Sequence, residues 1–148
     1  MKKNCFLIDY DVNPYTGPYV PVLDSLGTLP EFPDQRKIYD LTANGQIPPN
    51  AKAVLVYVFV TTLGDGNFQR GWYEISTRQG ETKYSQFMNV ATGQGLMAVN
   101  SGNLWFPFGD GKLDAKLSHP SDRKRSIAGK MADEDEEWSG VFVIGYRA

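Results

Sequence analysis

Ala53-Val54-Leu55-Val56-Tyr57-Val58-Phe59-Val60-Thr61 is the stretch that decides the fold of this chain of 148 residues. It is dense in β-branched and aromatic residues and is soon followed by Gly64-Asp65-Gly66, so we expect a β-strand that ends in a turn. One face of this strand is all valine, and the other carries Ala, Leu, Tyr, Phe and Thr. A strand in a sandwich usually shows one face to the opposite sheet and the other to water. This strand has no polar face.

The rest of the chain divides into short strands separated by turn residues. Gly109-Asp110-Gly111 predicts a hairpin between the strands on either side of it. Only residues 131–137 have a composition that suits a short helical turn. The predicted strands cover residues 37–41, 53–62, 68–77, 82–88, 103–108, 113–117 and 138–147. Seven or eight strands at this spacing predict an all-β domain, an antiparallel β-sandwich.

Residues 1–35 have a different composition from the remainder. They hold five of the nine prolines, interleaved with tyrosines and aliphatic residues. Proline at this density disfavours helices and most ladder pairing, while the apolar side chains favour burial. We therefore expect an extended Pro/Tyr-rich strap over residues 1–35, packed on the domain or on a neighbouring subunit, and a sandwich over residues 36–148. A disordered arm is the alternative for the first segment.

The two apolar faces of the central strand both need a cover. Leaving three valines in water would cost about 5 kcal/mol, which is comparable to the stability of a whole domain. The final strand, residues 138–147, is again apolar on both faces. We expect one face to meet the opposite sheet and the other to meet the strap or a second copy. The residues predicted to lie at an oligomer interface or under the strap are Val54, Val56, Val58, Val60, Val141 and Val143.

Trp138-Ser139-Gly140-Val141-Phe142-Val143-Ile144-Gly145-Tyr146 resembles the closing strand of C1q and tumour-necrosis-factor-like jelly rolls. In those families an aromatic residue, a Ser-Gly pair and an aliphatic run end the domain near a trimer axis. The resemblance covers nine residues, and residues 69–111 do not share it. It implies a jelly-roll-like sandwich and a homotrimer, and as a likeness of fold it carries no function.

Composition and charge exclude several classes of partner. A net charge of −2 and a pI of about 5.3 argue against nucleic acid and anionic membrane surfaces as ligands. No apolar stretch is long enough to span a membrane. The apolar run near the N-terminus is too short for a signal peptide, so we expect a cytoplasmic protein, or an extracellular one if a leader was removed or export is unconventional. Cys5 is the only cysteine, so the chain can form no internal disulfide.

The sequence offers few residues for catalysis, metal binding or cofactor binding. His119 is the only histidine, and it lies in a loop context with no partner signature around it. His119 and Cys5 together are too few ligands for a zinc site. Glu74 is the most interesting carboxylate because it lies within a predicted strand, although a solvent-facing position explains it as well. We therefore predict no enzyme activity, no metal and no cofactor.

Two segments pair a tryptophan with short polar side chains, which is the combination that sugar sites use. The first contains Gln69, Arg70 and Trp72, and the second contains Asn100, Asn103 and Trp105. The simpler interpretation is that both tryptophans are core residues on alternating strands. These six residues are the predicted ligand-binding set.

The leading functional hypothesis is a non-catalytic β-sandwich module that forms a homo-oligomer, with a trimer favoured. Its polar and aromatic loops would bind a glycan or a protein surface. The alternative is a structural assembly protein, such as a fibre, capsid or matrix component, that binds no small ligand. The third hypothesis, a hydrolase that depends on a carboxylate such as Glu74, has the least support.

Overall fold

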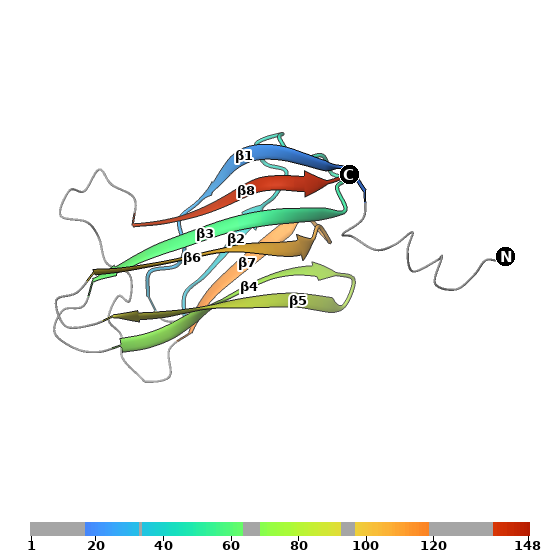
Figure 1. Cartoon of the computed structure of the whole chain (residues 1–148). Coiled ribbons are helices and arrows are strands. Elements are labelled where there is room, and N and C mark those ends of the chain that lie inside the picture. Colours follow the sequence, from blue (N-terminus) through green and yellow to red (C-terminus); the bar gives the residue numbers. More distant parts are fainter. Residues whose placement is uncertain (1–16, 33, 64–68, 93–96, 119–137) are drawn as a thin grey trace.

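A computed structural model describes residues 17–32, 34–63, 69–92, 97–118 and 138–148, which form eight strands in two packed sheets (Figure 1). Every strand pair is antiparallel. The strands are β1 (Tyr19–Gly27), β2 (Arg36–Asp40), β3 (Ala53–Leu63), β4 (Gln69–Gln79), β5 (Thr82–Thr92), β6 (Met97–Pro107), β7 (Lys112–Ser118) and β8 (Ser139–Arg147). The predicted all-β sandwich is thus confirmed.

The strand order is that of a jelly roll. One sheet has the order β1-β8-β3-β6 and the other has the order β2-β7-β4-β5. Successive strands therefore alternate between the sheets, except for β4 and β5, which form a hairpin closed by Gly80 in the left-handed region (φ +64°). An eight-stranded sandwich with this alternation is built from two Greek keys, and the jelly-roll-like expectation is confirmed.

The hairpin predicted at Gly109-Asp110-Gly111 is wrong, because β6 and β7 lie in different sheets. Pro107 ends β6, and the turn then folds against β4, where the Asp110 N–H donates to the Arg78 carbonyl at 2.8 Å. A Cβ atom on Gly109 would lie 2.0 Å from that carbonyl oxygen. This close approach carries the chain across to the second sheet instead of back along the first.

The core lies between the sheets, and β3 forms its centre. The even-numbered residues from Val54 to Val60 are fully buried there. From the other sheet, β7 alternates, with Leu113, Ala115 and Leu117 fully buried and the residues between them only partly so. Tyr73 is also fully buried, and its hydroxyl donates to the Pro30 carbonyl at 2.6 Å. The apolar residues at alternating positions of these strands therefore fill the space between the two sheets.

The N-terminal segment differs from the expected strap. Tyr19–Gly27 is an edge strand paired with β8, so the sandwich starts well before residue 36. An edge strand needs ladder hydrogen bonds on one side only, which is why it tolerates Pro21, and its pairing is interrupted by irregularities after Pro21 and after Ser25. Of the predicted strap, residues 1–16 and 33 lie outside the described ranges, and Leu29, after β1, is buried in the core.

Side chains bridge the two sheets along both of their open sides. On one side, the Gln86 amide on β5 donates to the Trp105 carbonyl on β6 at 2.7 Å. On the other side, Asn44, in the loop after β2, donates to the Asp24 carboxylate on β1 at 2.6 Å. The edge strands are thus tied to each other by side chains, which opposes edge-to-edge pairing with another chain.

Candidate functional site

The two sheets differ on their outer faces. The outer face of the β2-β7-β4-β5 sheet carries charged side chains that form ion pairs between neighbouring strands. These pairs are Arg36–Asp114 at 3.2 Å, Lys83–Glu74 at 3.0 Å and Lys112–Asp40 at 3.3 Å. The outer face of the β1-β8-β3-β6 sheet carries aromatic and aliphatic side chains instead. The first face is mainly charged, although Ile38 and Phe87 are exposed on it, and the second is mainly apolar, with Leu23 and Val99 the most exposed.

Three rings form what we call the aromatic patch at the centre of the apolar face: Tyr57 and Phe59 on β3, and Phe142 on β8. Their centroids are 6.1 to 6.4 Å apart, and the planes of Phe59 and Phe142 differ by only 14°. A Cβ atom on Gly140 would lie 2.5 Å from the Phe59 ring and 2.6 Å from the Phe142 ring. Both rings therefore rest against the glycine backbone with nearly parallel planes, whereas the Tyr57 ring is tilted against them by 32° and 36°.

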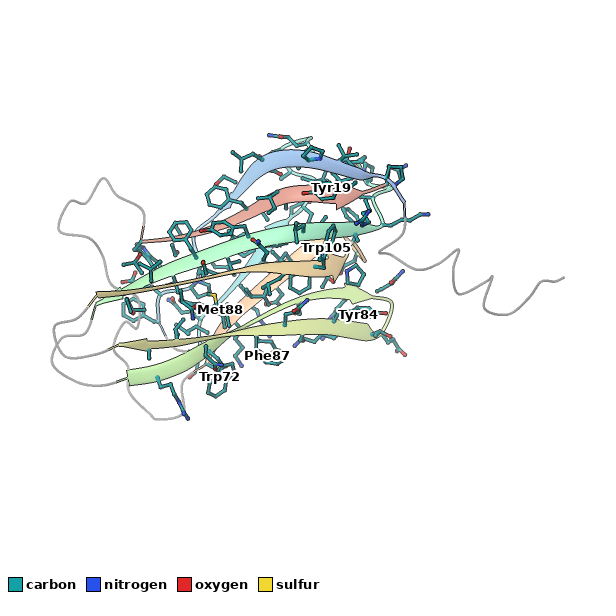
Figure 2. The ribbon with its side chains drawn as sticks, in the orientation of Figure 1. Tyr19, Trp72, Tyr84, Phe87, Met88 and Trp105 are labelled. Carbon is teal, nitrogen blue, oxygen red and sulfur yellow. The ribbon has the colours of Figure 1, made fainter. Side chains whose placement is uncertain are left out.

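A second cluster of rings lies at the end of the same face, where Tyr19 and Trp105 meet edge to face at 6.0 Å (Figure 2). The Tyr19 ring lies over Gly145, and its hydroxyl donates to the Ile144 carbonyl at 3.1 Å. The Arg147 guanidinium lies 5.8 Å from the Tyr19 ring centre and 5.2 Å from that of Trp105. These are cation–π distances, so this positive charge lies against the rings at the margin of the apolar face.

The valines predicted to meet a strap or a second copy are instead core residues. Val54, Val56, Val58, Val60, Val141 and Val143 all point between the sheets, and each is at most 1% exposed. The aromatic residues of the same strands lie on the opposite, outer side of the sheet. On that face, Leu23 of β1 is 68% exposed and Val99 of β6 is 67% exposed. The pattern predicted two apolar faces correctly, but it does not tell which one turns inward.

The predicted ligand-binding residues divide among three places. Arg70 and Asn100 line one crevice between β5 and β6. Trp72 is half-buried on the charged face, whereas Asn103 and Trp105 belong to the apolar face of the other sheet. The side chain of Gln69 is outside the described part of the structure. The six residues therefore do not form one site, and neither tryptophan points into the core.

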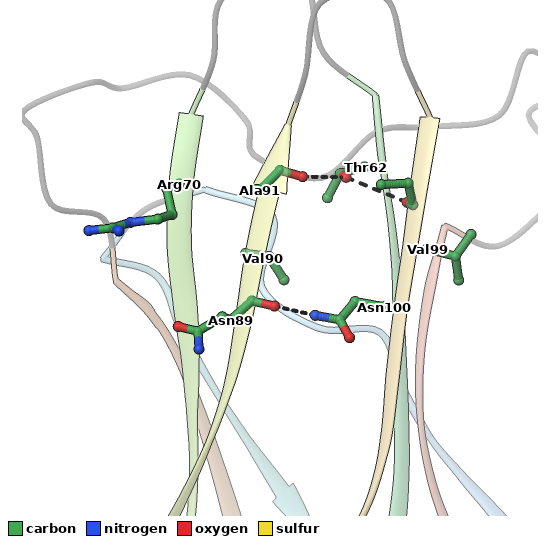
Figure 3. A pocket seen from close by; sticks show the side chains of 8 residues that line it. Thr62, Arg70, Asn89, Val90, Ala91, Val99 and Asn100 are labelled. Carbon is green, nitrogen blue, oxygen red and sulfur yellow. Dashed lines mark hydrogen bonds between the residues drawn. The ribbon is translucent and has the colours of Figure 1, made fainter.

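The crevice between β5 and β6 has a volume of about 300 Å³ and is lined mainly by Val90, Ala91, Ala98 and Val99 (Figure 3). Its polar groups already have structural partners. The Thr62 hydroxyl donates to the Ala91 carbonyl at 2.8 Å, and the Asn100 amide donates to the Asn89 carbonyl. The Arg70 side chain extends away from Asn100. These two hydrogen bonds join the sheets across the crevice, so few of its polar groups remain to hold a ligand.

Trp72 lies among charged and polar neighbours on the outer face of β4. Ser118 and Asn89 are directly opposite it on the adjacent strands. Phe87, which is 59% exposed, lies on β5 two residues from Asn89 and opposite Glu74. Figure 2 shows it on the same side of the sheet as Trp72. Sequence reasoning missed Phe87, although its alternation with the buried Met88 was the available signal.

Glu74 is held as an ionised carboxylate. It accepts a hydrogen bond from the Ser85 hydroxyl at 2.8 Å and forms the ion pair with Lys83. The hydrogen bond from Lys83 is the main cause that lowers the pKa of Glu74 below its ordinary value. A general acid at neutral pH needs the opposite shift, so this position does not suit Glu74 to proton donation.

The remaining residues and segments singled out in the sequence add little to the site. Within the described residues, no three acidic, histidine or cysteine side chains come together as a metal site would need. Cys5, His119, the helical turn expected at residues 131–137 and Gly64-Asp65-Gly66 are outside those residues. The described ranges also contain no helix long and apolar enough to cross a membrane.

No protein-family model matches the chain, and no curated protein matches it.

Proposed function

We propose that this protein is a non-catalytic, self-assembling binding module. Copies of the chain would bury the apolar face of the β1-β8-β3-β6 sheet and leave the charged sheet free to meet a glycan or protein ligand. The observation that carries the proposal is the contrast between the outer faces, one with a cluster of three aromatic rings and one with ion pairs.

A second copy is the occupant that the shape of the face favours. Small-molecule sites are usually concave, whereas the Phe59 and Phe142 rings lie close against Gly140 with nearly parallel planes. An apolar face of this kind buries most area against a second apolar face, and each exposed Leu or Val buried in this way contributes about 1.5–3 kcal/mol. Because the open sides of the sandwich are bridged by side chains, the face rather than an edge is the surface available for assembly. A trimer is the stoichiometry that the resemblance to C1q and tumour-necrosis-factor-like domains implies.

The test is size-exclusion chromatography with light scattering on the full-length chain at micromolar concentration. We expect three times the monomer mass for the wild type if the copies meet around a three-fold axis, as the resemblance implies, and twice the monomer mass if two apolar faces pack directly against each other. Leu23→Asp and Phe59→Asp should shift the mass toward monomer, because each buries an unpaired carboxylate at the interface.

Ile38→Asp is the matched control for Leu23→Asp. Ile38 is also an exposed aliphatic residue on an edge strand, 62% exposed, but it lies on the charged sheet. The control should keep the wild-type mass. A wild type that elutes as a monomer, or a control that dissociates as readily as Leu23→Asp, would contradict the proposal.

A further inference from the structure

The charged sheet carries an arrangement that neither the ion pairs nor the core requires. Trp72 and Phe87 place two aromatic rings at diagonal positions on the outer face of β4 and β5 (Figure 2), where the surroundings are otherwise polar. A large aromatic side chain that is 59% exposed, as Phe87 is, gains little for the stability of the fold. The C–H faces of a sugar ring stack on aromatic rings that are exposed in polar surroundings.

The charged side chains near these two rings are more often positive than negative. Glu74 is paired with Lys83, and Asp114 is paired with Arg36. Arg70 is exposed, two residues before Trp72, and Lys116 is opposite Glu74 on β7. Neither Arg70 nor Lys116 has an ion-pair partner within the described ranges. Among the described residues, the surroundings of Trp72 therefore hold two more positive than negative charges, although the whole chain has a net charge of −2.

Groups that can bind hydroxyls complete the arrangement. Asn89 on β5 and Ser118 on β7 are the register partners of Trp72 and flank it on both sides. Asn89 is exposed, and Ser118 is partly exposed. An amide can both donate to and accept from a sugar hydroxyl, and so can a serine hydroxyl.

From this juxtaposition we propose that the face around Trp72, formed by Arg70, Trp72, Phe87, Asn89, Lys116 and Ser118, binds an acidic oligosaccharide. The rings stack on the sugar, Asn89 and Ser118 bind hydroxyls, and Arg70 and Lys116 pair with its carboxylate or sulfate groups. This inference deepens the binding part of the proposed function by naming the site and the class of ligand.

Acidic sugar fits this face better than nucleic acid does. Binding to nucleic acid draws its affinity from many phosphate contacts, often about 6–10 lysines and arginines. Two surplus cations match a few anionic groups spaced along a sugar chain and are too few for a phosphate backbone.

The experiment is affinity electrophoresis of the full-length protein in native gels that contain one polymer each. The polymers are polygalacturonate, dextran sulfate, unmodified dextran and single-stranded poly(dT). We expect retardation by polygalacturonate, dextran sulfate or both, which tells whether carboxylate or sulfate is preferred, and none by dextran.

Variants locate the binding on this sheet. Phe87→Ala and Arg70→Gln should each weaken retention by the acidic polymer about tenfold, a change of about 1.4 kcal/mol. Both residues are exposed, so these variants should fold as the wild type does. Trp72→Ala should weaken retention further. Arg78→Gln and Tyr84→Ala, at the far end of the β4–β5 hairpin from Trp72, are the matched controls and should bind as the wild type does.

Three results would overturn the inference. They are equal retention by unmodified dextran, retention by poly(dT) that exceeds retention by the acidic sugars, and no retention by either acidic polymer. Light scattering on the same samples separates the two proposals. An assembled protein that binds no acidic sugar contradicts this site alone, whereas a monomer that binds contradicts the assembly alone.

Discussion

Gly109 and Gly80 adopt the same left-handed backbone but have very different surroundings. Their φ angles are +60° and +64°. An added Cβ atom would lie 2.0 Å from the Arg78 carbonyl oxygen at Gly109, yet it would meet nothing within 4 Å at Gly80. At the first position the glycine is needed for a close backbone approach, and at the second it is needed only for its φ angle.

Replacing each glycine by alanine should separate these two requirements. Gly80→Ala should lower the free energy of unfolding by about 1–2 kcal/mol, the cost of a left-handed alanine. Gly109→Ala should cost about 1–3 kcal/mol more, because a backbone carbonyl cannot easily move aside. Urea unfolding of both variants measures the difference. Equal losses would mean that the turn relaxes away from β4.

Glu74 makes the stability of the protein depend on pH in a defined direction. Its pKa in the folded state is lowered, chiefly by the hydrogen bond from Lys83, so its ionised form favours folding. This contribution is complete above the ordinary pKa of 4.5 and is lost as the pH falls through the lower folded pKa.

Glu74→Gln tests this contribution. Above about pH 5 the variant should be less stable by no more than about 1 kcal/mol, because the ion pair is partly exposed to solvent. The difference from the wild type should decrease as the pH falls below 4.5 toward pH 3, and it should shrink in high salt. Urea unfolding between pH 3 and pH 7 measures it. A difference that grows in acid would contradict the assigned shift.

At the scale of elements, the sequence was most informative where a strand alternates or is wholly apolar. The strands expected at residues 37–41, 53–62 and 113–117 correspond to β2, β3 and β7. β1 was missed, because proline content argues against ladder pairing unless the strand lies at an edge. Strand position within a sheet is a tertiary property, and no local pattern records it.

The candidate site was predictable only in part, for the same reason. Two tryptophans beside polar residues were recognised, but Trp72 and Trp105 face opposite sides of the molecule. Lys116 comes next to Trp72 through the pairing of β4 with β7, which are separated by more than thirty residues in the chain. Only the strand order brings these residues together.

The hydrogen bond between β4 and the end of β6 should matter for stability. The Thr77 hydroxyl is buried and donates to the Pro107 carbonyl at 2.8 Å. Thr77→Val keeps the shape but leaves that carbonyl unpaired, so we expect a loss of about 1–3 kcal/mol. Thr82→Val, at an exposed position on β5, is the control and should change stability by less than about 0.5 kcal/mol. Chemical unfolding compares the two, and equal losses would show that the bridge contributes nothing.

At the scale of the whole molecule, assembly and folding stability are coupled. If the apolar face is buried between copies, mass action makes the unfolding temperature rise with protein concentration. We expect a rise of several degrees across about a hundredfold range of concentration for the wild type. Phe59→Asp, once monomeric, should show no such dependence. Differential scanning fluorimetry measures both, and a wild-type unfolding temperature independent of concentration would argue against assembly.

The pairing of β1 with β8 also brings the start and the end of the described chain together. The Ala148 N–H donates to the Pro18 carbonyl at 3.2 Å, and the Arg147 guanidinium donates to the Gly17 carbonyl at 2.9 Å. A short linker from residue 148 to residue 17 would therefore close the sandwich into a ring. Opening that ring at the exposed hairpin of Gly80 and Glu81 would give a circular permutant with both sheets intact. The same geometry lets the domain be inserted into a surface loop of another protein with little strain on its host.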